Sequence, residues 1–172
     1  MYISDLKSFK YYIKTQLLTI VVAALTLKDY VIPIKFHIRL VDISELKFHE
    51  RTESNRLKSL KDEIYSDGIL KKPIVIDGTT RVIIDGHHRA EALRLLGCKK
   101  IPVCCVDYTR DEIGLKSNPE GAEITKDKVI EAALKNSPFK PKSTWHYIKF
   151  KNGIRHISYI QKRIDMPLKS LK

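Results

Sequence analysis

The sequence predicts one mixed α/β domain with a smaller extension at its C-terminal end. The 172 residues are 43% hydrophobic and 30% charged, the composition of a folded protein long enough to bury a core. Short runs of β-branched residues alternate with segments whose apolar residues recur at helical spacing. Glycine, proline and Asx residues punctuate the boundaries between these segments.

The N-terminal segment carries an apolar run, Leu17–Leu27, behind Lys7, Lys10 and Lys14. The run is too short to span a bilayer, and no small-residue cleavage site follows it. We therefore favour a helix over residues 5–27, packed on the domain or on a second subunit, over a targeting segment. Such a helix is a natural surface for a homodimer. A start codon assigned too far upstream is the alternative.

The remaining elements follow from spacing and turn residues. In chain order we expect a strand over Val31–Val41, a helix over residues 53–66 that ends at Gly68, a hairpin with arms Pro73–Ile76 and Arg81–Ile84, a helix from Arg89 to Leu96 closed by Gly97, and a strand over Ile101–Val106. Beyond it we expect a helix over Lys126–Leu134 and a second hairpin with arms Trp145–Phe150 and Arg155–Ile160.

The formal net charge of +12 indicates an anionic partner. Nucleic acid, a membrane surface and a nucleotide polyphosphate all qualify, so charge alone does not choose between them. The three cysteines, Cys98, Cys104 and Cys105, are an odd number without metal-ligand spacing. We expect buried free thiols, which suits a reducing cytoplasm.

The segment Asp85-Gly86-His87-His88-Arg89 lies where a strand feeds a helix. Backbone N–H groups and the positive end of the helix dipole meet there, which favours anion binding. Gly86 allows close approach of a phosphate, while the two histidines and Arg89 add donors. Asp85 suits a hydroxyl or a metal ion, and the alternative is that it caps the helix.

Upstream, Arg56 and Ser59 are three residues apart on the expected helix 53–66, so both share one face and can reach one phosphate cluster. Glu50 lies in the loop before that helix. A carboxylate placed against a substrate hydroxyl can act as a general base. The alternative for Glu50 is a solvated surface acid.

These motifs resemble the ParB/sulfiredoxin superfamily over about residues 36–108. The resemblance rests on Leu46–Glu50, Gly68–Ile76, Asp85–Ala92 and Leu96–Val103. Its ParB-type members carry Gly-Glu-Arg-Arg in the loop before the helix, and its sulfiredoxins carry Gly-Cys-His-Arg. His87 stands in the place of that cysteine, so sulfiredoxin chemistry is excluded.

The Asp-Gly-His-His-Arg version with the upstream His-Glu is similar to the free serine kinases of archaea. The stretch Lys151–Ser158, followed by Gln161, Arg163 and Pro167-Leu168, also resembles their C-terminal end. The resemblance implies transfer of a phosphoryl group from ADP or ATP to free L-serine, with Mg²⁺ arriving with the nucleotide and no metal site built of protein ligands alone. A ParB-like nucleotide-dependent DNA-binding regulator is the alternative.

Carried over by position, the resemblance implies a role for each site residue. Glu50 is the base and Asp85 aligns the serine hydroxyl or the metal-bound phosphate. The donor phosphates are held by Ser59, Gly86, His87, His88 and Arg89, together with Arg56. The substrate-binding residues are Arg155, with His156 or His146 beside it, and Thr52. The implied organisation is an N-terminal helix and linker (1–35), the nucleotide-binding domain (36–108) and a substrate-binding extension (109–172).

Overall fold

The structure, a computed structural model, describes residues 38–118 and 122–172. Its elements in chain order are β1 (Ile38–Asp42), α2 (Ser54–Asp67), β2 (Ile69–Leu70), β3 (Ile74–Asp77), β4 (Ile83–Asp85), α3 (His87–Leu95), β5 (Lys100–Val106), β6 (Ile113–Ser117), α4 (Lys126–Leu134), β7 (Thr144–Phe150), β8 (Gly153–His156) and β9 (Met166–Pro167), with short 3₁₀ turns at Ile43–Glu45, Ile157–Ile160 and Leu168–Ser170. The helix expected over residues 5–27 lies outside the described residues, as does the first part of the strand expected over Val31–Val41.

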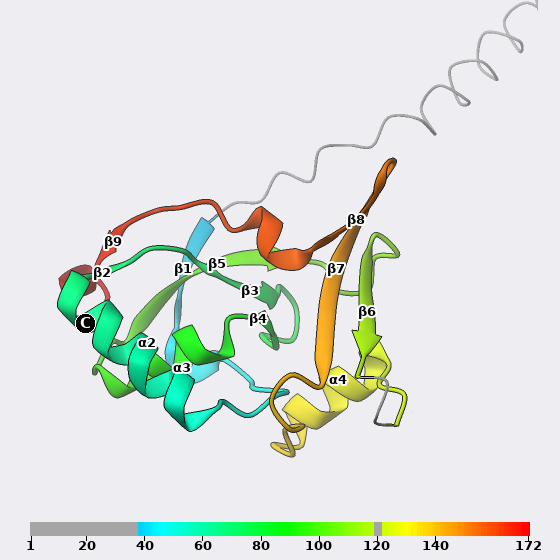
Figure 1. Cartoon of the computed structure of the whole chain (residues 1–172), viewed down its shortest axis with the longest axis horizontal. Coiled ribbons are helices and arrows are strands. Elements are labelled where there is room, and N and C mark those ends of the chain that lie inside the picture. Colours follow the sequence, from blue (N-terminus) through cyan, green and yellow to red (C-terminus); the bar gives the residue numbers. More distant parts are fainter. Residues whose placement is uncertain (1–37, 119–121) are drawn as a thin grey trace, which may run out of the picture. The chain divides into compact units, whose positions relative to one another are not determined.

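A four-stranded sheet in the order β1-β5-β3-β4 forms the centre of the domain (Figure 1). The strand β3 runs parallel to β5 and antiparallel to β4, and β1 runs antiparallel to β5. All four residues of β3 are buried, so both faces of this strand are covered. A strand covered on both faces needs a continuous apolar run, which Ile74-Val75-Ile76 supplies.

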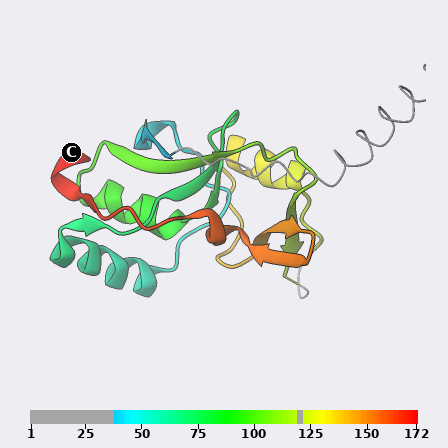
Figure 2. The same ribbon diagram turned by 90° about the horizontal axis from the view of Figure 1, so that it is seen from above.

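The helices α2 and α3 pack against each other, and α3 packs against β3 (Figures 1 and 2). Their apolar residues join the sheet in one hydrophobic cluster that includes Ile64, Leu93 and Ile101. The start of α2 therefore lies near the start of α3, as the hydrogen bond from the Glu53 N–H to the His88 ring requires. This packing brings two loops together at one end of the helix pair.

The chain after β5 forms a three-stranded antiparallel sheet in the order β6-β7-β8, together with α4. A second hydrophobic cluster, including Val75, Val129 and Ile148, joins these elements to the central sheet. Residues Phe36–Lys172 thus form one compact unit. None of the helices in the described ranges is long and apolar enough to cross a membrane.

Most of the expected elements are confirmed, including α2 with its left-handed Gly68 cap and the helix Lys126–Leu134. The strand expected over Arg155–Ile160 is wrong beyond His156. Ile157 and Ile160 are both buried and three residues apart, and a 3₁₀ turn places such residues on the same side. The strand β6 was not expected, because Gly114 interrupts its apolar run.

Candidate functional site

The junction between β4 and α3 has the backbone geometry of an anion site. Gly86 is the N-cap of α3 with a left-handed φ of 105°, and no side chain caps the helix. A Cβ at Gly86 would lie 2.5 Å from Cγ2 of Ile74, so only glycine fits. The helix ladder begins with Ala90 N–H donating to Gly86 O. The earlier N–H groups of the turn have no partner within the helix and are available to an anion.

Arg89 is committed to the protein interior, which corrects the expectation of a guanidinium free to hold phosphates. Its Nη2 donates to Asp85 Oδ2 at 2.8 Å and to Gln161 Oε1 at 3.0 Å. Its Nη1 donates to the carbonyl of Pro73 at 2.6 Å. Both terminal nitrogens therefore hold the loop to β3 and to the C-terminal segment. Asp85 pairs with Arg89 in the same way and does not cap α3.

The imidazole rings of the two loop histidines, His87 and His88, are neutral, so neither adds a positive charge to the donors expected of the loop. Burial lowers the pKa of His87 well below its usual value, and neighbouring histidines lower it further. His88 accepts a hydrogen bond at Nε2 from the Glu53 N–H. Burial, followed by the positive charge of Arg56, also lowers the pKa of His88. Their backbone N–H groups are what the loop offers to an anion.

Glu50 is half-buried, so it is not the solvated surface acid that stood as the alternative. Its Oε1 accepts hydrogen bonds from the N–H of Thr144 at 3.0 Å and lies 3.2 Å from the Thr144 hydroxyl. Burial raises the pKa of Glu50, and hydrogen bonds from the backbone N–H groups of Thr144, Lys142 and Ser143 oppose that rise. A carboxylate with a raised pKa in a defined cradle is suited to accept a proton.

The Glu50 segment contacts the loop Asp85–Arg89 at two points, and the loop before β7 holds it from the other side. His49 Nδ1 lies 3.2 Å from His87 Nε2, and Glu53 N–H donates to His88. Opposite, Phe139 N–H donates to His49 O and Arg51 N–H to Phe139 O. The structure therefore brings Glu50 and the loop Asp85–Arg89 into one site.

The residues of α2 lie at the rim of this site. Arg56 is exposed and close enough to lower the pKa of His88 and of Arg89. Ser59 is exposed one turn further along the helix, and Thr52 is half-buried in the loop before it. Arg56 is thus a cation beside the loop whose side chain is not committed to the core.

A cavity of about 420 Å³ lies behind two residues that contact the Glu50 segment, Phe139 and Ser143. It is lined by Asn118, Ala122, Ile124, Phe139, Lys140, Pro141 and Ser143. Ser143 and Phe139 connect it to the Glu50 segment, through the contacts described above. A cavity of about 650 Å³ between α4 and the β3–β4 turn contains none of the predicted site residues. The smaller cavity is therefore the better candidate for a substrate site, because its lining residues contact the Glu50 segment.

His146 is wrong as a partner for a substrate carboxylate. Its ring is buried, and its Nε2 lies 2.7 Å from the Tyr108 hydroxyl. Burial lowers the pKa of His146 well below its usual value, so the ring is neutral and carries no charge to attract a carboxylate. A further edge-on contact with His49 makes His146 part of the core behind the site.

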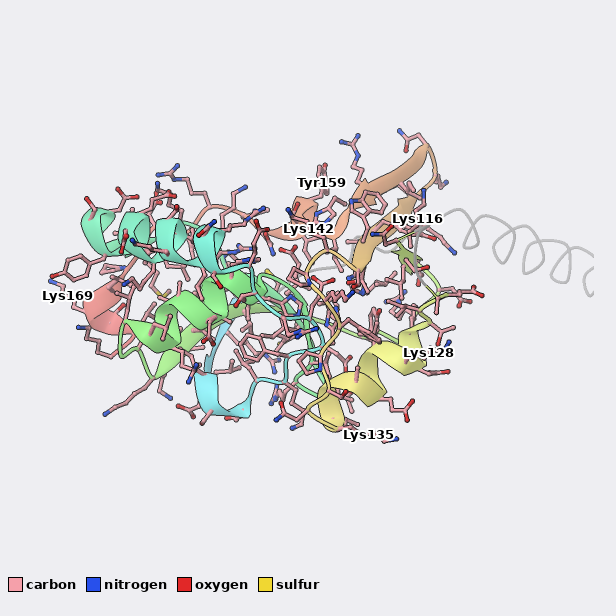
Figure 3. All side chains as sticks on the ribbon, turned by 60° about the horizontal axis from the view of Figure 1, so that its bottom comes forward. Lys116, Lys128, Lys135, Lys142, Tyr159 and Lys169 are labelled. Carbon is pink, nitrogen blue, oxygen red and sulfur yellow. The ribbon has the colours of Figure 1, made fainter. Side chains whose placement is uncertain are left out.

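Arg155 and His156 lie on the β7–β8 hairpin. The Arg155 guanidinium is exposed and stacks over Tyr159, which Figure 3 labels. His156 Nδ1 accepts a hydrogen bond from the Ser158 N–H, and its ring packs beside Trp145. Their described contacts stay within this hairpin and the turn after it, and neither residue lines the cavity next to the Glu50 segment.

Sequence analysis missed Thr144 and Lys142 as site residues. Lys142, labelled in Figure 3, lies on the loop between α4 and β7 with a left-handed φ of 62°. Its Nζ lies 3.1 Å from Glu53 Oε2, beside the residue that holds His88. Left-handed backbone at a non-glycine residue often marks a functional site. The run Lys142-Ser143-Thr144, rich in donors and placed before a strand, was the signal available.

Known proteins similar to this chain include serine kinases. An ATP-dependent L-serine kinase of Staphylothermus marinus is 37% identical over 93 residues, 51% of this chain and 36% of that protein. An ADP-dependent L-serine kinase of Thermococcus kodakarensis is 29% identical over 77 residues, 42% of this chain and 32% of that protein. The matches thus span about a third of the length of these curated relatives.

A solved structure of a free serine kinase in complex with AMP matches with a TM-score of 0.66 at 18% identity, covering 83% of this chain and 97% of that one. This likeness shows a common fold. The family described as the ParB N-terminal domain matches residues 25–117. That range is more than half of the 172 residues and includes the sheet, α2, α3 and the loop between β4 and α3. The chain belongs to the ParB N-terminal domain family.

Proposed function

We propose that this protein is a kinase that transfers a phosphoryl group from ADP or ATP to the hydroxyl of free L-serine. One observation carries the proposal: the segment that presents the Glu50 carboxylate is bonded to the anion-binding loop through His87 and His88. A base and a phosphate site fixed within one hydrogen-bonded unit are what phosphoryl transfer to an alcohol needs. The serine kinases among the similar proteins support the choice of acceptor.

The donor phosphates bind at the start of α3. The backbone N–H groups from Gly86 to Arg89 face the phosphates, and Arg56 and Lys142 add positive charge from two sides. Ser59 adds a hydroxyl from α2. Both nucleotides present a terminal phosphate to this loop, so either suits it.

The transfer step is a single displacement. The serine oxygen forms a bond to the terminal phosphorus while the bridging P–O bond of the nucleotide breaks and its electron pair stays on the departing phosphate. The hydroxyl proton moves to the Glu50 carboxylate, and the resulting carboxylic acid then releases that proton to water, which regenerates the base. The loop N–H groups and the cations neutralise the charge that develops on the phosphoryl oxygens.

Among the described residues, no cluster of three or more His, Cys, Asp or Glu side chains forms a metal site. The donor set fits a Mg²⁺ ion that arrives on the nucleotide and takes few protein ligands, as such ions commonly do. Asp85 accepts hydrogen bonds at Oδ2 from Arg89 and Gln161, and its carboxylate would help to align the serine hydroxyl or the metal-bound phosphate. When bound, the ion supplies charge neutralisation at the phosphates.

The acceptor serine occupies the cavity beside Glu50, which at about 420 Å³ has room for a small amino acid. Arg155, His156 and Thr52 remain the proposed substrate-binding residues. A planar guanidinium can hold the serine carboxylate through two hydrogen bonds.

The test is incubation of purified protein with Mg²⁺, L-serine and either ADP or ATP, followed by chromatography for O-phosphoserine. Product with one nucleotide establishes the kinase and identifies its donor. Absence of product with both nucleotides, while both still raise the melting temperature, contradicts the kinase.

The second candidate is a nucleotide-dependent DNA-binding regulator, which the family and the net charge of +12 favour. It predicts DNA binding that weakens steeply with salt concentration, because several phosphate contacts release counterions. The kinase predicts product formation that DNA does not change.

A further inference from the structure

A chain of buried polar contacts runs behind Glu50. The Thr144 hydroxyl lies 3.2 Å from Glu50 Oε1 and 3.1 Å from His49 Nε2. The other ring nitrogen of His49, Nδ1, lies 2.6 Å from the carbonyl oxygen of Ile83. The His49 side chain is fully buried. The chain therefore links the proposed base to the backbone of β4 through one hydroxyl and one imidazole.

The proton on His49 can be assigned from these contacts. A carbonyl oxygen only accepts, so at 2.6 Å the Nδ1 of His49 must carry a proton and donate it to Ile83. Burial lowers the pKa of His49 to about 4, so the ring carries only that one proton at neutral pH. His49 Nε2 is therefore an acceptor, and its neighbour is the Thr144 hydroxyl.

Thr144 has one hydroxyl proton and two acceptors that compete for it. If the hydroxyl donates to an ionised Glu50, the buried Nε2 of His49 is left without a donor, which is costly in a dry interior. If it donates to His49, its oxygen accepts the proton of a protonated Glu50. Every contact in the chain is then satisfied. All donors and acceptors of this chain therefore have partners only when Glu50 is protonated.

We propose that His49 is a positioning residue for the transfer reaction, which turns the Thr144 hydroxyl away from the Glu50 carboxylate and so favours the form of Glu50 that has accepted the serine proton. This inference rests on the proposed kinase function for its purpose, and on the hydrogen-bond geometry for its physical basis. Without His49 as a competing acceptor, the hydroxyl would stabilise the ionised carboxylate and weaken the base.

Other ionisable groups surround this chain. They are Glu53 in the Glu50 segment, His87 and His88 in α3, Lys142 in the loop before β7, and His146 in β7. The buried rings of His87 and His146 are neutral, and the Lys142 ammonium is paired with Glu53. His87 faces the donor nitrogen of His49, and not Nε2. None of these groups supplies a second donor to His49 Nε2 in the described contacts.

The test compares Thr144→Val with Thr144→Ser in the full chain. Glu50 is titrated by NMR of its side-chain carboxyl carbon, with its signal assigned through Glu50→Gln. In the proposed arrangement the Thr144 hydroxyl oxygen accepts a hydrogen bond from protonated Glu50 and so stabilises only that form. Thr144→Val removes this bond and therefore lowers the pKa of Glu50, by about half a unit to one unit for one hydrogen bond. Thr144→Ser keeps the hydroxyl and the wild-type titration. A hydroxyl that donated to the carboxylate would give the opposite sign, and a raised pKa in Thr144→Val overturns the proposal.

A second pair of variants tests His49 directly. His49→Asn keeps an N–H near Ile83 O but removes the acceptor at Nε2, whereas His49→Gln keeps an acceptor near Thr144. We expect the pKa of Glu50 to fall in His49→Asn only, with the acidic limb of the kcat–pH profile moving to lower pH in parallel. An unchanged titration in His49→Asn contradicts the inference.

Kinase activity tests the proposed function, and the NMR titration of Glu50 tests the positioning role of His49. A wild-type protein without kinase activity would refute the proposed function, while the NMR titration would still decide the role of His49. Kinase activity with Glu50 titrating alike in all four variants would keep the kinase and refute the positioning role.

Discussion

The Arg89 guanidinium and the Asp85 carboxylate lie 2.8 Å apart across the junction of β4 and α3, and both side chains are largely buried. The same guanidinium nitrogen also donates to Gln161, and its partner nitrogen donates to the carbonyl of Pro73. One arginine therefore fastens the anion-binding loop to β3 and to the C-terminal segment. The side chains of Asp85 and Arg89 thus hold the loop in shape, and its backbone N–H groups are what we propose to bind phosphates.

Arg89→Ala is expected to destabilise the fold by about 3 kcal/mol, because it leaves the largely buried Asp85 carboxylate without its counter-charge, with only Gln161 still bonded to it. Urea denaturation measures the loss. Arg94→Ala on the same helix is the matched control, since Arg94 forms an exposed ion pair with Glu91 and its loss costs about 1 kcal/mol or less. Equal stability of the two variants would contradict the locking role of Arg89.

Glu50→Gln is expected to lower turnover by about a hundredfold to ten-thousandfold, the usual contribution of a general base. The amide keeps the shape and the contacts to Thr144 but cannot accept the serine proton. Nucleotide affinity, measured by the shift in melting temperature, is expected to stay unchanged. Glu63→Gln, which alters a surface pair with Lys71, is the control. Full turnover by Glu50→Gln would remove this residue from the mechanism.

Lys142→Ala is expected to weaken nucleotide binding about tenfold, because the ammonium lies beside Glu53 and the phosphate loop. Calorimetric titration with ADP and ATP measures the effect, and the deficit should shrink as salt screens the wild-type interaction. Lys135→Ala serves as the control, because Lys135 forms an exposed ion pair with Glu131 at the end of α4 and lies outside the proposed site. Identical affinities in both variants would place Lys142 outside the phosphate site.

The domain is expected to lose stability in acid because of its buried histidines. The pKa of His49 falls to about 4 on folding, so the unfolded chain binds more protons between pH 6.5 and 4 and stability declines as pH falls through that window. The titration of His49 alone lowers the free energy of unfolding by about 3 kcal/mol at pH 4 relative to neutral pH. The lowered pKa values of His87 and His146 add in the same direction, while the raised pKa of Glu50 acts in the opposite direction.

Melting temperatures between pH 4.5 and 7.5 test this expectation. His146→Gln keeps an acceptor for the Tyr108 hydroxyl but does not titrate, so its melting temperature should depend less on pH than that of the wild type. A flat profile for the wild-type protein would show that the histidines do not control acid stability.

The sequence by itself determined most of the elements and the location of the candidate anion site. Helical spacing ending at Gly68 predicted α2, and the apolar run before Asp77-Gly78 predicted the hairpin of β3 and β4. The glycine between a strand and a helix predicted the loop at Gly86. These are local features, set by spacing, turn chemistry and the free N–H groups of a helix start, so neighbouring residues are enough to predict them.

Only the tertiary structure decided what each polar side chain does. Arg89 reaches Gln161, 72 residues away, and Glu50 reaches Thr144, 94 residues away. His87 and His146 are neutral because other elements bury them. Burial and long-range hydrogen bonds set both the charge and the direction of a side chain, and neither is encoded by the residues beside it in the chain.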